Sequence, residues 1–510
     1  MKLKNKIYRY TGICGFVAAL ALSACSDDIQ VDVFDKNPNE GATESLAFLS
    51  HKGLPNVEAD VEVRADSLSR FICLNLTKAT AVGRSLQVEL VSDEDLVTSY
   101  NMANATNLKQ FPIENVTLGN EGNLTVEPWR TVSEPITVTF DERDSKTPLG
   151  DYLLPVRVKG EEPDMLPGKQ LLWFRVSVGK ERITLKARDV QPIACVQING
   201  TNPLNAGLYT LKNSGEPFFS QVVLFSANIN WDAQQKKAIV TFNENLTPLM
   251  ENRNKYIKPL QDKGIKVTLG LLGNRDGVCF RNYTQQGALD FAKEIKAVVD
   301  GYGLDGVFMD EEYMNYGANN LPPTNSTSWG YLCYYLKQLM PDKLVTVYNY
   351  DINNDFKGTT MGQPTGNFVD YAVQSSSNSF NSTGYQSFNG MDKRHWGPWS
   401  AIIYDDFDDK NYGGAHPYLS QLQTDSYQAQ IKRVKDEYGV VFFYDLAAFC
   451  PNNATYIANA IKGLGSNGLD QATLAYNYSD YFTEYAKVLF NSDTVFRDGD
   501  PIKNDYSPSN

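Results

Sequence analysis

The sequence predicts an α/β protein in which a parallel (β/α)8 barrel follows an antiparallel β-sandwich domain. Three observations support this prediction. Residues 40–182 contain short alternating segments separated by polar turns, with no helices between them. From residue 183 to about 495, apolar strand-like runs alternate with longer stretches of helical pattern. A chain of 510 residues is also too long for one ordinary domain.

The first 25 residues have the pattern of a bacterial export signal. A basic start over residues 2–9 precedes an apolar run over 13–22, which is too short to cross a bilayer stably. Leu22–Cys25 (Leu-Ser-Ala-Cys) then resembles the lipobox of bacterial lipoproteins, in which the Cys becomes the lipidated first residue. We therefore expect a signal peptide over 1–24, lipidation of Cys25 and a linker over 25–39. A plain signal peptide with an incidental Cys is the alternative.

The residues after Cys25 indicate a destination. Ser26-Asp27-Asp28 resembles the acidic signal with which Bacteroidetes lipoproteins reach the outer face of the outer membrane. No other apolar stretch of the sequence is long enough to span a membrane, so the lipid is the expected anchor. The resemblance implies an outer membrane lipoprotein exposed at the cell surface.

Residues 40–182 predict the sandwich. Strand patterns lie at Asp60–Arg64, Ser85–Val91, Ile136–Phe140, Leu153–Val158 and Leu171–Val178. Strands at this spacing are typical of an antiparallel β-sandwich. The stretch resembles the N-terminal sandwich domain of Bacteroidetes surface lipoproteins, and it contains no catalytic constellation. We expect a spacer, with glycan binding left open.

Residues 183–495 predict the barrel, and 496–510 a C-terminal tail. Strand patterns lie at Ile193–Ile198, Gln221–Ser226, Lys266–Leu271, Gly306–Asp310, Leu344–Tyr348, Tyr371–Gln374, Val440–Tyr444 and Ala472–Tyr476. Helical patterns fit between several of them, as at Gln286–Val299 and Trp329–Met340. Alternation repeated about eight times is typical of a (β/α)8 barrel. An open doubly wound sheet is the alternative, but no Gly-rich phosphate loop follows the first strand.

Composition excludes several classes of function. The net charge of −13 argues against nucleic acid as a partner, because phosphate binding needs clustered Lys and Arg. Three His residues leave little room for a His-rich metal site or for a His-dependent triad. The acidic run Asp405–Asp409 lacks the spacing of an EF-hand loop. We expect neither a metal nor a cofactor.

The segment Leu304–Tyr313 combines a buried strand pattern with a cluster of acids. Because side chains alternate along a strand, Phe308, Asp310 and Glu312 point to one side, the interior if this is a barrel strand. The two carboxylates have backbones about 7 Å apart at the carboxyl end of the strand. Barrel enzymes hold their catalytic groups at that end, so the sequence predicts a catalytic pair.

The same residues resemble a known signature. Asp305–Glu312 resembles the Asp-Gly-x-Asp-x-Asp-x-Glu motif of family 18 glycoside hydrolases, and Tyr313 makes it most similar to the endoglycosidase H branch of endo-β-N-acetylglucosaminidases. Gly264–Asn274 resembles the third strand and loop of that branch, and the resemblance covers about 190–490. Phe308 stands where the family has an inner-facing Asp. We therefore expect Asp310 to titrate differently, because no carboxylate on its own strand shares its proton.

The resemblance implies a reaction assisted by the substrate. The carbonyl oxygen of the sugar's 2-acetamido group attacks the anomeric carbon and gives an oxazolinium intermediate. Glu312 is then the general acid, with a pKa raised by its pocket. Asp310 orients the acetamido group and stabilises developing positive charge. Asp305 faces away from the substrate and is structural.

The resemblance also implies substrate contacts and a substrate class. We expect contacts from Tyr313, and from Asn349, Gln374 and Tyr444 at the ends of the fifth, sixth and seventh strands. Each of these last three has the alternative of a rim residue that meets only water. The expected substrates are the N-glycans of glycoproteins, cut between the two core N-acetylglucosamines.

Two rival functions stay open. The first is a chitinase of the same family, although chitinases usually have a Trp at the end of the last strand and Leu474–Tyr478 has none. The second is a non-catalytic glycan-capture lipoprotein, but such relatives typically lose the acid that Glu312 supplies.

Overall fold

The computed structural model describes residues 45–506 with gaps. These gaps are residues 53–56, 65–66, 142–145, 161–163, 180–182, 184, 351, 353, 376–379, 403–421, 445, 447–478 and 493. The predicted signal peptide, Cys25, the linker, Asp405–Asp409, Ala472–Tyr476 and Leu474–Tyr478 lie outside the described residues. In the part of the chain that is described, no helix has the length and apolarity needed to cross a membrane.

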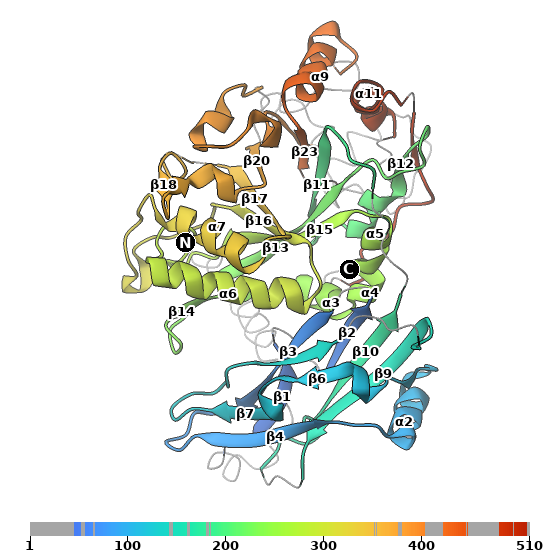
Figure 1. Cartoon of the computed structure of the whole chain (residues 1–510), viewed down its shortest axis with the longest axis vertical. Helices are drawn as coiled ribbons and strands as arrows, with labels where there is room; N and C mark the ends of the chain where they lie inside the picture. The colour runs from blue at the N-terminus through green and yellow to red at the C-terminus, as the bar shows by residue number, and fades with distance from the viewer. Residues whose placement is uncertain are drawn as a thin grey trace, which may run out of the picture.

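The N-terminal part is a β-sandwich, at the lower end of Figure 1. One sheet has the order β1-β3-β8-β6 and the other β2-β10-β9-β4-β7, with β5 beside β9. The strands are β1 (Ala47–His51), β2 (Glu58–Val63), β3 (Leu68–Leu76), β4 (Arg84–Leu90), β5 (Lys109–Gln110), β6 (Val116–Leu118), β7 (Asn123–Val126), β8 (Ile136–Phe140), β9 (Gly150–Val158) and β10 (Leu171–Val178). Helix α2 (Glu94–Asn104) follows β4, so the prediction of strands without intervening helices is wrong at this point.

Alternating burial explains why these segments form two packed sheets. In β8 and β10 every second residue is buried, so each strand has one apolar face. Phe140 of β8 and Phe174 of β10 meet between the sheets, with ring centroids 5.4 Å apart. The pairing is antiparallel except where β2 pairs with β10 and β5 with β9, which are parallel. The predicted sandwich is therefore mixed at these two pairs.

The C-terminal part is a parallel barrel, above the sandwich in Figure 1. Its strand order is β21-β20-β17-β16-β15-β13-β11-β23-β22, with β14 added to β13. The strands are β11 (Gln191–Gln197), β13 (Gln221–Asp232), β14 (Lys237–Thr241), β15 (Lys266–Gly273), β16 (Gly306–Asp310), β17 (Leu344–Asn349), β20 (Tyr371–Gln374), β21 (Trp396–Gly397), β22 (Ser400–Ile402) and β23 (Val440–Tyr444). All neighbours along this path pair in parallel.

The two ends of that path meet in one segment of chain. Only two residues, Pro398 and Trp399, separate β21 from β22, so these strands are the two halves of one barrel strand. With the halves counted together, the nine strands of the path become eight, and the predicted (β/α)8 barrel is confirmed. Val440–Tyr444 was predicted as the seventh strand, which is wrong: it is the eighth, and it pairs with both β11 and β22.

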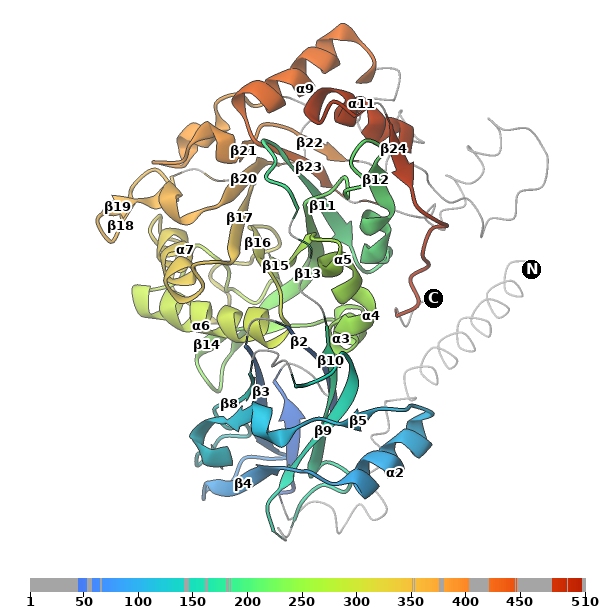
Figure 2. The same cartoon turned by 45° about the vertical axis from the view of Figure 1, so that its right-hand side comes forward.

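Helices cover the outside of the barrel. They are α3 (Leu246–Glu251), α4 (Arg253–Tyr256), α5 (Lys258–Asp262), α6 (Gln285–Gly301), α7 (Ser328–Leu339), α9 (Asp425–Glu437) and α11 (Ser479–Leu489). The helices predicted at Gln286–Val299 and Trp329–Met340 are α6 and α7. Thr284 caps α6 by accepting a hydrogen bond from the Gly287 amide. In Figures 1 and 2, α6 lies along the boundary between barrel and sandwich.

The sandwich and the barrel share a polar boundary. Arg253 of α4 is 1% exposed and pairs with Glu62 of β2 at 3.2 Å. Lys52, which follows β1, pairs with Glu294 of α6 at 2.8 Å. Phe71 of β3 packs against Gly301, at the end of α6. Buried charges paired across a boundary hold the two parts in one relative orientation.

The segment predicted as a tail is part of the barrel unit as far as it is described. The boundary at 495 falls on the first residue of β24 (Val495–Arg497), which pairs with β12 (Tyr209–Leu211). Tyr506 is 7% exposed and donates a hydrogen bond to the carbonyl of Ile198 at 3.0 Å. The prediction of a separate tail is wrong for these residues, because short pairing segments of this kind leave no periodic pattern.

Candidate active site

Strand β16 presents one face to the barrel interior. Phe308 belongs to an inner core with residues of β11, β13, β17, β20 and β23, whereas Val307 and Met309 belong to the outer core under the helices. The alternation predicted from the sequence is therefore present. It directs Asp310, two residues after Phe308, to the interior at the carboxyl end of the strand, level with Leu272 of β15.

Aromatic rings fill the barrel beneath Asp310. The rings of Phe308 and Phe442 stack with centroids 5.4 Å apart and planes 2° apart. The Tyr348 ring, from the residue level with Asp310, lies 5.8 Å from Phe308, and the Phe225 ring lies 6.3 Å from Phe308. This layer makes the floor beneath the acids apolar, so ionising a carboxylate above it is costly.

Asp310 is a buried carboxyl group with a raised pKa. Its side chain is 3% exposed, and its Oδ1 accepts no hydrogen bond from any described residue. Burial raises its pKa well above the ordinary value, and the neighbouring carboxylates of Glu312 and Glu311 raise it further. Burial therefore disfavours the ionised carboxylate, and Oδ1 is a buried acceptor without a donor among the described residues.

Glu312 follows the strand and is half-buried. Burial also raises its pKa. Its backbone carbonyl lies against Gly273 at the end of β15, where an added Cβ would come within 2.7 Å of that oxygen. Glycine there permits the close approach of the two loops, and Glu312 can keep a proton at higher pH than an exposed glutamate.

Tyr313 sits on the rim beside the two acids. It has a φ of 56° and is 52% exposed. The Arg275 guanidinium lies over its ring at 5.2 Å, and the Arg275 amide donates to its carbonyl at 2.8 Å. The Tyr313 ring is thus exposed and supported by Arg275, and its contact with a sugar stays a prediction.

Asp305 lies at the opposite end of the strand from Asp310. Its Oδ2 accepts hydrogen bonds from the Gln261 side chain at 2.8 Å and from the Val267 amide at 2.9 Å. These bonds tie β16 to β15 and α5. The position agrees with the structural role expected for Asp305.

The other predicted contacts fall into two groups. Tyr444 packs against the inner core and accepts a hydrogen bond from Gln197 at 3.0 Å. Asn349 donates to Gln374 at 3.2 Å. Along their strands these two residues share a face with outer-core residues, whereas their neighbours Tyr348 and Val373 face the interior. Asn349 and Gln374 are thus paired with each other, and their contact with substrate stays a prediction.

Sequence reasoning missed Tyr348. Continuing the register of β16 and β17 beyond Met309 and Val347 places Tyr348 beside Asp310 on the inner face. The signal was available, because Thr346 and Tyr348 alternate with the apolar outer residues of the same strand. The strand's last residue, Asn349, drew attention instead because it is polar.

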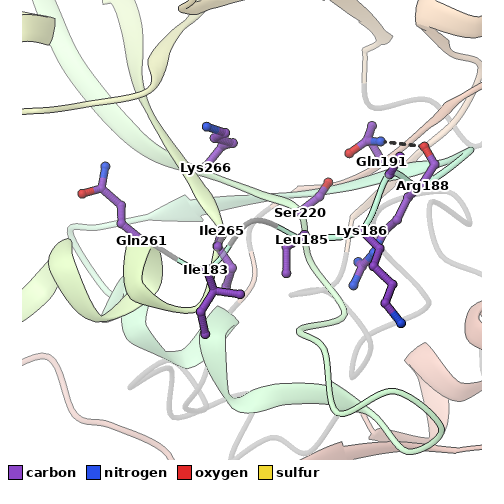
Figure 3. A pocket seen from close by; sticks show the side chains of 11 residues that line it. Ile183, Leu185, Lys186, Arg188, Gln191, Ser220, Gln261, Ile265 and Lys266 are labelled. Carbon is purple, nitrogen blue, oxygen red and sulfur yellow. Dashed lines mark hydrogen bonds between the residues drawn. The ribbon is translucent and has the colours of Figure 1, made fainter. Parts of the chain in front are cut away.

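No metal centre appears in the described part of the chain, where no three His, Cys, Asp or Glu side chains are grouped to hold an ion. A cavity of about 270 Å³ does lie at the other end of the barrel, lined by Ile183, Leu185, Lys186, Ala187, Arg188, Gln191, Ser220, Gln261, Gly264, Ile265 and Lys266 (Figure 3). Gln191 and Lys266 begin their strands, so this cavity is at the amino ends, away from Asp310 and Glu312. In (β/α)8 barrels the residues at the amino ends of the strands serve stability, and the active site lies at the carboxyl ends.

Asp310→Asn is expected to stabilise the fold. The pKa of Asp310 is higher in the folded protein than in the unfolded chain. The protonated side chain therefore contributes stability that is fully present below the ordinary carboxyl pKa and is lost as pH rises through the folded pKa. A neutral amide removes this loss. We expect the variant to melt at least about 2 °C above the parent at pH 8 and to approach it near pH 4, measured by circular dichroism.

Asp305→Asn is the matched control, because that carboxylate is well bonded on the same strand. It should melt below the parent at pH 8. If Asp310→Asn melted below the parent at pH 8, the charge of the Asp310 carboxylate would be stabilised by its surroundings, which would contradict this prediction.

The chain is similar to several known proteins. A family model described as an N-terminal domain matches residues 43–165. The chain is 46% identical over 194 residues to endo-beta-N-acetylglucosaminidase F1 of Elizabethkingia meningoseptica, which is 37% of this chain and 57% of that protein. It is 41% identical over 182 residues to an endo-beta-N-acetylglucosaminidase of Flavobacterium sp. (strain SK1022), 35% of this chain and 56% of that protein. The chain thus matches rather more than half the length of each.

Among solved structures, EndoBT-3987 of Bacteroides thetaiotamicron with a Man5GlcNAc product matches 90% of this chain and 97% of its own, at 25% identity and a TM-score of 0.48. The endo-beta-N-acetylglucosaminidase of Cordyceps militaris matches 59% and 92%, at 16% identity and a TM-score of 0.35. The resemblance to endo-β-N-acetylglucosaminidases is confirmed: this chain is similar in sequence to two bacterial proteins of that name.

Proposed function

We propose that this protein is an endo-β-N-acetylglucosaminidase that hydrolyses the GlcNAc-β-1,4-GlcNAc core bond of N-glycans. The observation that supports it best is the placing of Asp310 and Glu312 at the carboxyl end of one barrel strand, with the pKa of both raised by burial. The names of the two curated relatives give the same activity.

In the first step Glu312 protonates the oxygen of the bond to be broken. The carbonyl oxygen of the 2-acetamido group on the same sugar attacks the anomeric carbon as the C1–O bond breaks. The shortened glycan is left as an oxazolinium, and the GlcNAc on the protein leaves with the proton. In the second step the Glu312 carboxylate takes a proton from water. The water oxygen attacks C1, the bond from C1 to the acetamido oxygen breaks, and the oxazolinium ring opens to restore the acetamido group. The configuration at C1 is retained after two inversions.

Asp310 suits the acetamido group because its Oδ1 is buried without a donor among the described residues. A bound substrate supplies the missing N–H, and the nitrogen then gains positive charge as the oxazolinium forms. Both changes favour the ionised carboxylate, which burial by itself disfavours. Asp310 therefore stabilises the transition state more than the ground state, which is what accelerates a reaction.

The direct test is incubation with a high-mannose glycoprotein. The protein should increase the electrophoretic mobility of the glycoprotein, and Glu312→Gln should abolish the change. Binding of the glycoprotein without a mobility change would favour a glycan-capture lipoprotein. Hydrolysis of chitooligosaccharides in place of the glycoprotein would favour a chitinase, although the last barrel strand ends in Tyr444, not in Trp.

We also propose that the mature protein is lipidated at Cys25 and displayed on the outer membrane, on the evidence of the Leu22–Cys25 motif and the acidic residues after it. In a bacterial host of the matching kind, Cys25→Ser is expected to lose incorporation of labelled palmitate and to leave the membrane fraction. Retention of the label in Cys25→Ser would contradict the proposal. Cys14→Ser, within the apolar run, is the matched control and should stay labelled.

A further inference from the structure

Glu311 stands between the two acids and has no part in the proposed mechanism. It is 0% exposed. Asp310 and Glu312 can share a face only if the residue between them points the other way. A buried carboxylate is costly unless hydrogen bonds satisfy it, so its partners explain why it is there.

Two loops supply those partners. In the loop after β15, the Phe280 amide donates to Glu311 Oε2 at 3.2 Å, and the Cys279 thiol also hydrogen-bonds to the carboxylate. In the loop after β16, the Tyr316 hydroxyl donates to Oε1. Glu311 therefore joins the loop that bears Glu312 to the neighbouring loop at the carboxyl end of the barrel.

The loop after β15 is itself firmly held. Phe280 stacks on Trp329 of α7 with centroids 5.0 Å apart. Arg281 pairs with the buried Asp355 at 2.9 Å, and its amide donates to Tyr316 Oη at 3.1 Å. Glu311 is thus bonded to a rigid support, not to a surface loop.

We propose that Glu311 is a positioning residue for the reaction, one that fixes the backbone from which Glu312 reaches the sugar. This inference rests on the proposed function. Three contacts on successive residues define that backbone: the Glu311 carboxylate, the Glu312 carbonyl against Gly273, and the Tyr313 carbonyl bonded to Arg275. Without the first of them, the peptide before Glu312 is free to turn.

Glu311 also acts on Asp310 through charge. Its carboxylate raises the pKa of Asp310, after burial and Glu312. Among the described residues, the titratable and charged groups that interact with Glu311 are Cys279, Arg281 and Tyr283 from the loop after β15, Tyr316 from its own loop, and Asp310 at the end of the strand. Removing the charge should therefore lower the pH at which Asp310 ionises.

The test is the pH dependence of glycan hydrolysis by Glu311→Gln. We expect kcat to fall about 10- to 100-fold, because a small misplacement of a catalytic group is costly, while KM changes less than about threefold. The acidic limb of the profile should move to lower pH. Asp305→Asn is the matched control, a bonded carboxylate at the far end of the same strand, and should lose stability without moving the profile.

Tyr316→Phe is the second variant, and it tests the positioning role of Glu311 if Glu311→Gln does not fold. It keeps the carboxylate and removes one donor, so kcat should fall by less than in Glu311→Gln, again with KM nearly unchanged. This inference alone would be overturned if both Glu311→Gln and Tyr316→Phe kept the kcat and the pH profile of the parent. The parent must then be active and Glu312→Gln inactive. A parent that cleaves no N-glycan would overturn the proposed function, and this inference with it.

Discussion

Glu312→Gln is expected to lower kcat for glycan hydrolysis by about 10²- to 10⁴-fold, the range of a lost general acid–base group. The amide has nearly the shape of the acid but cannot give a proton to the leaving oxygen. KM should change little, because the glycan contacts stay in place. Initial rates on a purified N-glycopeptide measure both constants.

The pH dependence of the parent gives an independent view of the same group. Because burial raises the pKa of Glu312, its proton is retained above the ordinary glutamate pKa and lost as pH rises through the raised value. Hydrolysis should therefore extend toward neutral pH and fall on the basic side. A Glu312→Gln protein that keeps the parent's rate and profile would remove Glu312 from the chemistry.

Glu62→Gln is expected to lower the free energy of unfolding by about 3–5 kcal/mol, since it leaves a buried cation without its partner. Glu62 and Arg253 have side chains 2% and 1% exposed and lie on opposite sides of the boundary between sandwich and barrel. Urea unfolding followed by tryptophan fluorescence measures the change. Burial alone would raise the pKa of Glu62, but Arg253, Arg64 and Lys258 hold it below its ordinary value.

The sign of that shift predicts the pH dependence of the loss. A lowered pKa gives stability that is present above the unfolded pKa and lost as pH falls through the folded one, so the two proteins should converge in acid. Glu89→Gln, in the exposed pair with Arg157, is the matched control and should cost less than about 1 kcal/mol. An equally small effect of Glu62→Gln at neutral pH would show that the boundary does not stabilise the chain.

Much of the fold could be predicted because hydrophobic alternation survives in the sequence wherever a strand is long. Gly306–Asp310 has buried residues on both faces, and its flanking Asp and Glu residues mark its two ends. The inward direction of Phe308, and with it of Asp310, followed from the period of two alone. The period and the carboxyl-end rule were enough to single out Asp310 and Glu312, whereas their catalytic roles came from the family resemblance and stay a prediction.

The seventh strand could not be predicted in the same way. Pro398 removes a backbone donor and divides the strand into β21 and β22, of two and three residues. Pieces that short show no alternation, so Val440–Tyr444 took the seventh place in the prediction. β24 is equally short, and only its pairing with β12 reveals it.

Side-chain pairing was also beyond the sequence. Asn349 and Gln374 are polar residues at strand ends, which suggests a site, but their hydrogen bond to each other depends on the register of β17 with β20. The buried position of Glu311 could not be predicted from the sequence either. Its burial depends on the loop after β15, whose path no pattern in the sequence specifies.

The most direct measurement is mass spectrometry of an N-glycopeptide after incubation with the parent protein and with Glu312→Gln, side by side. The parent should leave the peptide with a single N-acetylglucosamine and release a glycan that ends in the other, while the variant leaves the glycopeptide whole. An intact glycopeptide with the parent, a peptide stripped of both sugars, or equal cleavage by the variant would each contradict the account.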